Sequence, residues 1–295
     1  MLSGSVKAVS TKKVLTFSAF FCAQVFLILL LLSPRAGFAQ SFNCAPATIY
    51  ESAKVEHVFD GDTLKLEDGR KVRLIGIDTP EVFSRKYVIP DNIKARGEQS
   101  KRALRGLLDS AKNRISLSYE KERFDRYGRT LAHVYLPDGQ NLQAWLIYHG
   151  HALAFTTPPN DQMTQCYRRL EHLAQSKKLG IWQLDSYQLK SVNQLTENAT
   201  GFHRLRGEVS KLLKTDKRLV IILDGQVEIN IYTSDLHNFN LYRIQQLQGK
   251  TIEVRGWLKR KRTSRNMRPT FNKNAAQYRM TLRHEDSLNI DKVLH

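Results

Sequence analysis

The sequence of 295 residues has little cysteine, little proline and no excess of acidic charge. It holds 3 cysteines, 8 prolines and 16 glycines, and no cysteine belongs to a CxxC pair. The low glycine and proline content excludes a collagen-like chain, and the isolated cysteines disfavour a zinc site. With 28 acidic against 46 basic side chains and 41% hydrophobic residues, the chain is neither an acidic nor an intrinsically disordered protein.

Long hydrophobic runs are also lacking, with one exception between Val14 and Leu32. Three lysines precede this run, and the small residues Gly37 and Ala39 follow it, which is the order of an export signal cleaved after Ala39. The alternative is an uncleaved membrane anchor through residues 14–32, because about 20 apolar residues can span a bilayer. We therefore expect an exported protein, periplasmic or secreted, or a membrane-anchored one that faces outside the cytoplasm.

The cysteine content changes once the leader is removed. Cys22 lies inside the apolar run, so the mature chain keeps only Cys44 and Cys166. Two cysteines in an oxidising compartment can form a disulfide. The alternative is two unpaired buried thiols.

Beyond the leader, residues 40–182 alternate short strand-like runs with helical patterns. Strand-like runs occupy 53–59, 63–68, 71–77, 114–120 and 129–136, and helical patterns occupy 93–112, 141–150 and 163–178. Asp-Gly and Asp-Thr-Pro turn signals separate the runs. This order predicts a small closed five-stranded barrel with three helices, of the oligonucleotide-binding (OB) type.

The remaining residues predict a second, smaller β domain. Residues 183–203 are polar and without periodicity, which indicates a linker. Over 204–295, five strand-like runs at 204–213, 218–224, 226–233, 250–260 and 277–284 enclose a helical pattern at 236–247. The predicted fold class is therefore mainly β (α+β), with an OB-type barrel at 40–182 and a second β domain at 204–295, for which an OB-like barrel is one interpretation.

Four acidic residues fall in predicted turns of the first barrel: Asp60, Asp62, Asp78 and Glu81. Carboxylates gathered at one end of a barrel repel one another, and a bound cation would relieve that repulsion. Oxygen donors without histidine or cysteine select a hard ion, Ca²⁺ or Mg²⁺.

Two arginines occur near these acids in the predicted strands. Arg73 precedes Asp78 by five residues, and Arg129 follows the turn at 125–128. Guanidinium groups match phosphate oxygens, so two arginines beside a hard cation describe a phosphodiester site. Simple alternation places Arg73 and Asp78 on opposite faces of a strand, so their convergence requires a bend near Gly76.

Four ordered motifs, VFDGDTLKL, VRLIGIDTPE, DRYGRTLAHVY and KKLGIW, resemble the staphylococcal nuclease (thermonuclease) family over residues 53–182. The resemblance implies a five-stranded OB barrel with three helices and a Ca²⁺-dependent enzyme that cuts DNA and RNA to leave 3′-phosphate ends. It also implies Asp62, Asp78 and the Thr79 carbonyl as Ca²⁺ ligands, Glu81 as general base, and Arg73 and Arg129 as the arginines that bind phosphate. Asp60 is expected to support the turn without binding the metal.

Substrate contacts are expected to follow the family in part. Arg126 and Tyr127 fit its contacts to the terminal phosphate. Phe155 and Thr157 stand where the family has two tyrosines that face the nucleotide, and of these only Phe155 can stack on a base.

The C-terminal part is the more basic half, with 20 basic and 11 acidic side chains over residues 183–295 against 22 and 17 over 40–182. Beside Trp257 lies a basic run that suits phosphate tracking and base stacking on nucleic acid: Lys259, Arg260, Lys261 and Arg262. Alternatives are a solvated hairpin or binding to envelope lipid or polysaccharide.

The predicted function is an exported Ca²⁺-dependent nuclease acting on DNA or RNA, with an accessory nucleic-acid-binding domain. The alternatives are an exported nucleic-acid-binding protein without activity and an envelope-tethered interaction protein. No protein partner is implied.

Overall fold

The computed structural model describes residues 1, 4, 44–83, 88–261 and 276–290. The predicted leader, its apolar run at 14–32 and Arg262 therefore lie outside the described residues, apart from Met1 and Gly4. Across the described part of the chain, no helix has the length and apolar character needed to span a membrane. Residues 42–295 form one unit by their internal contacts.

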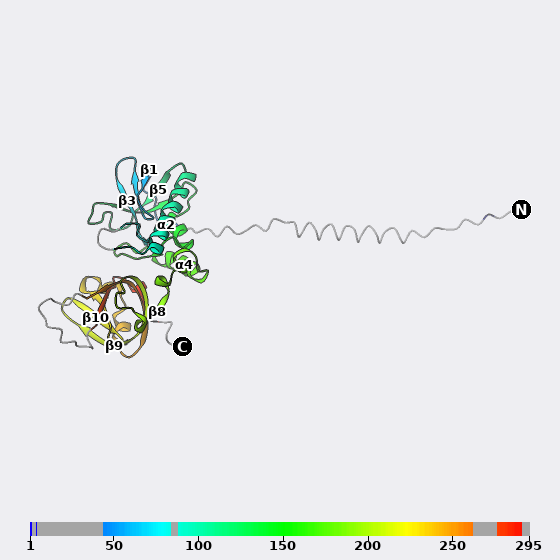
Figure 1. The fold of residues 1–295 in the computed structure, drawn as a ribbon. Coiled ribbons are helices and arrows are strands. Elements are labelled where there is room, and N and C mark those ends of the chain that lie inside the picture. The colour runs from blue at the N-terminus through cyan, green and yellow to red at the C-terminus, as the bar shows by residue number, and fades with distance from the viewer. Residues whose placement is uncertain (2–3, 5–43, 84–87, 262–275, 291–295) are drawn as a thin grey trace. The chain divides into compact units, whose positions relative to one another are not determined.

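The first barrel has the strand order β1-β2-β3-β6-β5 and closes by pairing β5 with β1. Figure 1 labels β1, β3 and β5 of this barrel. Its strands are β1 (Glu51–Val58), β2 (Thr63–Leu66), β3 (Lys71–Leu74), β5 (Arg114–Ser118) and β6 (Thr130–Tyr135). The β3–β6 pair is parallel and the other pairs are antiparallel. The five predicted strands are thereby confirmed.

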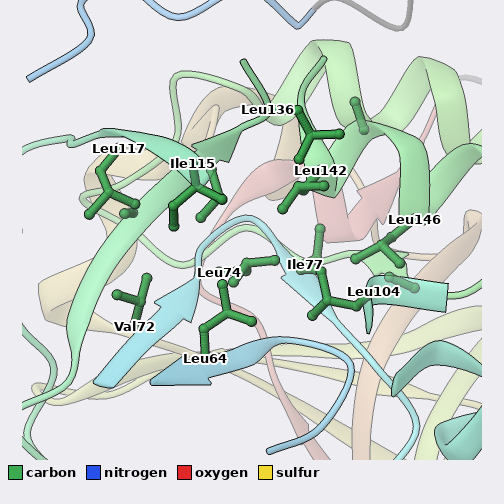
Figure 2. Close-up of a cluster of buried hydrophobic side chains, with 14 of the residues drawn as sticks. Leu64, Val72, Leu74, Ile77, Leu104, Ile115, Leu117, Leu136, Leu142 and Leu146 are labelled. Atoms are coloured by element: carbon green, nitrogen blue, oxygen red, sulfur yellow. The ribbon is translucent and has the colours of Figure 1, made fainter. Parts of the chain in front are cut away.

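Three helices accompany this barrel, as predicted: α2 (Asp91–Ser110), α3 (Leu142–Tyr148) and α4 (Thr164–Ser176). The start of α3 is fixed by Asn141, whose side chain accepts a hydrogen bond from the Ala144 amide at 2.8 Å. Leucine, isoleucine and valine side chains from strands and helices fill the interior (Figure 2). In β3, Val72 and Leu74 are buried in this core, so alternation turns Arg73 away from it.

A second barrel follows in the C-terminal half. Its strands are β9 (Gly201–Lys214), β10 (Arg218–Leu223), β11 (Val227–Tyr232), β12 (Thr251–Arg260) and β13 (Tyr278–Thr281). They pair in the order β9-β10-β11-β13-β12, and β12 returns to β9. Only the β11–β13 pair of this ring is parallel, as β3–β6 is in the first barrel. Both barrels therefore share the OB-type strand order, which confirms the predicted fold class.

Short elements complete the described chain. Between the barrels, in the segment predicted as a linker, lie η2 (Asp185–Tyr187), β8 (Leu189–Ser191) and η3 (Val192–Gln194), preceded by η1 (Gly180–Gln183). The second barrel also carries η5 (Glu285–Ser287) and β14 (Leu288–Asn289). The predicted helix at 236–247 divides into η4 (Thr233–Asn238) and α5 (Leu241–Gln245), because Asn240 caps α5 by accepting the Arg243 amide at 3.1 Å.

The two barrels meet through a shared apolar cluster and a buried ion pair. The cluster joins Trp182 of the first barrel's last segment to Phe202 and Trp257 of the second. Arg255 of β12 donates to both carboxylate oxygens of Glu171 on α4, one of them at 2.9 Å, and both side chains are buried. Residues 183–203, which were predicted as a linker, therefore connect two barrels that are in direct contact.

A disulfide joins Cys44 to Cys166 of α4, with their Cα atoms 5.8 Å apart, which confirms the predicted pairing. Cys44 also accepts hydrogen bonds at its carbonyl from Tyr135 at 2.9 Å and Asn141 at 3.3 Å. The bridge therefore ties the residues before β1 to the helices of the first barrel.

Replacing both cysteines by serine should lower the free energy of unfolding by about 2–4 kcal/mol, because the cross-link closes a long loop in the unfolded chain. Urea unfolding of oxidised wild type, dithiothreitol-treated wild type and the double variant measures this. Reduced wild type should match the variant. Equal stability of all three proteins would contradict a structural role for the bridge.

Candidate active site

The turn between β1 and β2 fixes the first acidic pair. The Asp60 side chain accepts a hydrogen bond from the Asp62 amide at 3.0 Å, which closes the turn. Between them, a Cβ on Gly61 would lie 2.8 Å from the Ser100 Cβ and 2.9 Å from Thr79 side-chain atoms, so only glycine fits. Asp62 is consequently held in a buried position.

A bend at Gly76 brings the next acid toward Arg73, as the sequence required. β3 ends at Leu74, and β4 (Ile77–Asp78) leaves the barrel to pair with β7 (Leu153–Ala154). Gly76 has φ +79°, and a Cβ there would lie 2.6 Å from the Tyr167 ring. The left-handed backbone and this close contact both demand glycine.

Arg73 occupies the centre of the acidic group. Its Nη1 lies 2.7 Å from Asp62 Oδ2, and its Nη2 lies 3.1 Å from Asp78 Oδ1. It also donates to the carbonyls of Leu74 at 3.1 Å and Ile77 at 3.3 Å. Burial alone would lower the pKa of Arg73, but Asp62 and Asp78 outweigh it and raise that pKa. The guanidinium is therefore charged and rigidly held.

Asp62 is itself organised by two threonines. Its Oδ2 accepts hydrogen bonds from the Thr79 amide at 3.2 Å and the Thr79 hydroxyl at 3.1 Å. Its Oδ1 accepts the Thr63 hydroxyl at 3.0 Å. Thr79 follows β4 directly, so these bonds link the two acidic segments.

The other three carboxylates of the site, Asp60, Asp78 and Glu81, have raised pKa values. Burial, followed by the charge of Asp62, raises the pKa of Asp60 to about 6. Burial raises the pKa of Asp78 to about 7 against the opposing charge of Arg73. Burial and then Asp62 raise the pKa of Glu81, while Arg73 and Arg129 lower it. In each case burial is the largest cause of the raised pKa, and neighbouring acidic charge adds to it.

Arg129, the residue before β6, reaches the same end of the barrel. Its Nη1 lies 3.5 Å from the Thr63 hydroxyl, which in turn bonds Asp62. Asp125 orients it by accepting from the Arg129 amide at 2.9 Å and from its Nε at 2.7 Å. Asp125 was not predicted from the sequence to have this role. The Asx-turn pattern in DRYG was the available signal, because the same carboxylate accepts the Tyr127 amide at 2.9 Å.

The residues predicted to bind a terminal phosphate gather beside Arg129. The Arg126 guanidinium lies 4.8 Å from the centre of the Tyr127 ring and donates to its hydroxyl at 2.6 Å. Arg129 lies 5.7 Å from the same ring. Tyr127 is 68% exposed, so the group is open to a ligand.

Other predicted substrate contacts lie apart from this group. Phe155 packs against the apolar cluster of Trp182, and its amide bonds the Gly76 carbonyl at 3.0 Å. In the second barrel, Arg260 lies 3.3 Å from Glu197, Lys261 lies 2.6 Å from Glu228, and Lys259 is exposed.

The donor set suits a hard cation. Asp62 and Asp78 flank one guanidinium, and Thr79 follows immediately, so the site brings together carboxylate and carbonyl groups, the donor types that hard cations prefer. Within 44–83, 88–261 and 276–290, no group of three or more His, Cys, Asp or Glu side chains is arranged to hold a metal ion. A cation here would take its remaining ligands from water and substrate.

The fold and the site together define an OB-type barrel with a carboxylate and arginine site suited to phosphate esters. The model for the staphylococcal nuclease homologue family matches residues 71–184. The thermonuclease of Staphylococcus intermedius is 38% identical over 136 residues, which cover 45% of this chain and 77% of that protein. The chain therefore belongs to the staphylococcal nuclease family.

Two further relatives show how far the similarity extends. Endonuclease YncB of Bacillus subtilis (strain 168) is 35% identical over 139 residues, which span 45% of this chain and 62% of that protein. The thermonuclease of Staphylococcus hyicus is 29% identical over 174 residues, covering 58% of this chain and 98% of that protein. The family model ends at residue 184, before the second barrel begins at Gly201.

Proposed function

We propose that this protein is an exported calcium-dependent nuclease that hydrolyses phosphodiester bonds of DNA, RNA or both and leaves 3′-phosphate ends. Membership of the family, and relatives named thermonuclease and endonuclease, support a nuclease. The observation that carries the proposal is Arg73 between Asp62 and Asp78, with Arg129 joined to the same group through Thr63.

In the proposed reaction, water attacks phosphorus in line with the 5′ oxygen. A new bond forms between phosphorus and the water oxygen, and the bond to the 5′ oxygen breaks, so the phosphate stays on the 3′ oxygen. Negative charge builds on the equatorial oxygens during this step. Asp62 and Asp78 hold Arg73, and Asp125 holds Arg129, before substrate binds. Two guanidinium charges fixed in this way are what electrostatic stabilisation of that charge requires.

Glu81 is suited to accept the proton of the attacking water. Its side chain reaches solvent, and its partial burial raises its pKa, which makes it a stronger base than an ordinary glutamate. It lies within electrostatic reach of both arginines and of Asp62. The proton then passes to the leaving 5′ oxygen through solvent.

Asp62, Asp78 and the Thr79 carbonyl would hold Ca²⁺, with Asp60 supporting the turn behind them. When bound, Ca²⁺ supplies positive charge beside a phosphoryl oxygen. Mg²⁺ should substitute poorly, because it demands near-ideal octahedral geometry and gives up water reluctantly.

Analysis of product ends tests the proposed reaction. DNA and RNA oligonucleotides labelled at the 5′ end are digested with the purified protein in calcium. The fragments are then treated with a phosphatase that removes 3′-phosphates, and the mobility of the fragments should change. Fragments that carry 5′-phosphates and 3′-hydroxyls would contradict the assigned direction of cleavage.

Export is supported by the leader, in which three lysines precede an apolar run, and by the disulfide between Cys44 and Cys166. Cell fractionation, with the mature N-terminus sequenced, tests it. We expect the protein outside the cytoplasm with its first residue just after Ala39. A full-length chain in the membrane fraction would favour the anchored alternative.

A further inference from the structure

A cavity of about 610 Å³ lies between the two barrels, next to the proposed active site. Pro80 and Glu81 line it from the first barrel, Ile93 from α2, and Trp257 and Lys259 from β12. Its volume falls within the range of about 300–1,000 Å³ that small-molecule sites occupy. The cavity therefore connects the proposed general base to the basic strand of the second barrel.

One wall of the cavity is aromatic. Phe202 stacks on Tyr187 with ring centres 5.6 Å apart, and it meets Trp257 edge to face at 6.4 Å. Phe202 and Trp257 are direct partners in the β9–β12 register. Phe202 is buried, whereas Trp257 is half-buried and lines the cavity. An indole supported from behind in this way is a rigid platform for stacking.

The rim of the cavity is cationic. Lys259 lies two residues after Trp257 on β12, so both side chains extend from the same face of the strand. Lys259 is exposed and has no ion-pair partner among the residues that the structure describes. Arg260 also lines the cavity, and its pairing with Glu197 at 3.3 Å is an exposed contact of little strength.

We propose that this cavity is a nucleotide subsite that takes an unpaired stretch of the substrate strand. A base stacks against Trp257, and the phosphate beside it contacts Lys259, while the strand continues toward Glu81. This inference rests on the proposed nuclease function and names its substrate class. Bases in a duplex are stacked inside the helix and cannot enter, so the subsite favours single-stranded nucleic acid.

Fluorescence anisotropy on the mature protein tests the subsite without requiring cleavage. The probes are a labelled single-stranded 12-mer of thymidine and a duplex of equal length, both in EGTA. Trp257→Ala should raise the Kd for the single strand about tenfold and leave the duplex Kd nearly unchanged, because stacking of an unpaired base is lost. Trp257→Phe should keep most of the affinity.

Lys259→Ala provides a second variant that cannot disturb the core, because the side chain is exposed. It should weaken single-strand binding and lower the salt slope by about 0.7, the value for one lost phosphate contact. Lys211→Ala is the matched control, an exposed lysine of β9 that does not line the cavity.

The outcomes separate this inference from the proposed function. Single-strand affinity unchanged in both Trp257→Ala and Lys259→Ala would overturn the subsite. An equal loss for single strand and duplex would also overturn it, because that result indicates a general role in stability or charge. Failure of the proposed function would be seen in a cleavage assay instead, in which the wild-type protein binds nucleic acid but does not cut it in calcium.

Discussion

Arg73→Lys should lower kcat for DNA cleavage by about 100- to 1,000-fold while the protein remains folded. Lysine keeps the positive charge but cannot bridge Asp62 and Asp78 with two nitrogens, nor present a bidentate fork to a phosphate. Arg129→Lys should show a similar loss, because the Nε that bonds Asp125 disappears with the guanidinium. Steady-state kinetics at saturating calcium measures both effects.

Arg70→Lys is the matched control for these variants. Arg70 lies just before β3, in the same barrel, and pairs with Glu51 and Asp68 at the surface. Its replacement should leave kcat within about twofold of wild type, since exposed ion pairs contribute little. Thermal unfolding of all three variants separates loss of chemistry from loss of fold. An Arg73→Lys enzyme with more than half of the wild-type kcat would place the reacting phosphate elsewhere.

Arg255→Ala should lower the free energy of unfolding by about 3 kcal/mol or more, because it breaks a buried ion pair between the barrels. Arg255 donates to both oxygens of Glu171 and to the Ala154 carbonyl at 2.9 Å. After the change, Glu171 remains buried and keeps its ion pair with Arg168 and the hydrogen bond from the Ala154 amide, but it loses both bonds from Arg255. Chemical denaturation at neutral pH measures the loss. Arg206→Ala is the control, since Arg206 on β9 pairs with Glu253 but is half exposed.

The pH dependence of this loss gives an independent check. Burial raises the pKa of Glu171 above its ordinary value of 4.5, against the opposing charge of Arg168. The folded protein therefore binds that proton more tightly than the unfolded chain, and stability falls as pH rises between the two values. Removing Arg255 raises the folded pKa further, so the penalty should be smaller at about pH 5 than at about pH 8. A penalty independent of pH would contradict an electrostatic role.

The same contact makes removal of the second barrel a poor probe of its function. A chain that ends at Trp182 would lose Arg255 and the aromatic partners Phe202 and Trp257. It would leave Glu171 without its buried partner and expose apolar surface. Point variants at the rim of the cavity, such as Lys259→Ala, test substrate binding without breaking this contact.

The first barrel was predictable from sequence because each strand is short, alternating and bounded by a turn signal. Val72 and Leu74 illustrate this, since their alternation with Arg73 fixes which side faces the core. The order of strands and helix also predicted the second barrel. The single helix expected at 236–247 is instead two short helices, η4 and α5. Asn240 interrupts that helix through a capping bond, a local contact that periodicity does not reveal.

The residues of the candidate active site were predictable from sequence, but most of the contacts between them were not. The need for a bend at Gly76 followed from strand alternation, and the structure supplies it. The Arg255–Glu171 pair joins residues 84 positions apart and had no local signal. The cavity beside Trp257 likewise depends on how two barrels pack, which sequence periodicity does not encode.

The most direct test of the central claim is the rate at which the purified mature protein cuts labelled single-stranded DNA in calcium and in EGTA. The arrangement of Asp62, Asp78 and Thr79 predicts cleavage in calcium, loss of cleavage in EGTA and recovery when calcium is restored. Asp62→Ala should remain inactive at every calcium concentration. Full activity in EGTA, or wild-type activity of Asp62→Ala, would contradict the assignment of this acidic and arginine group as a calcium-dependent active site.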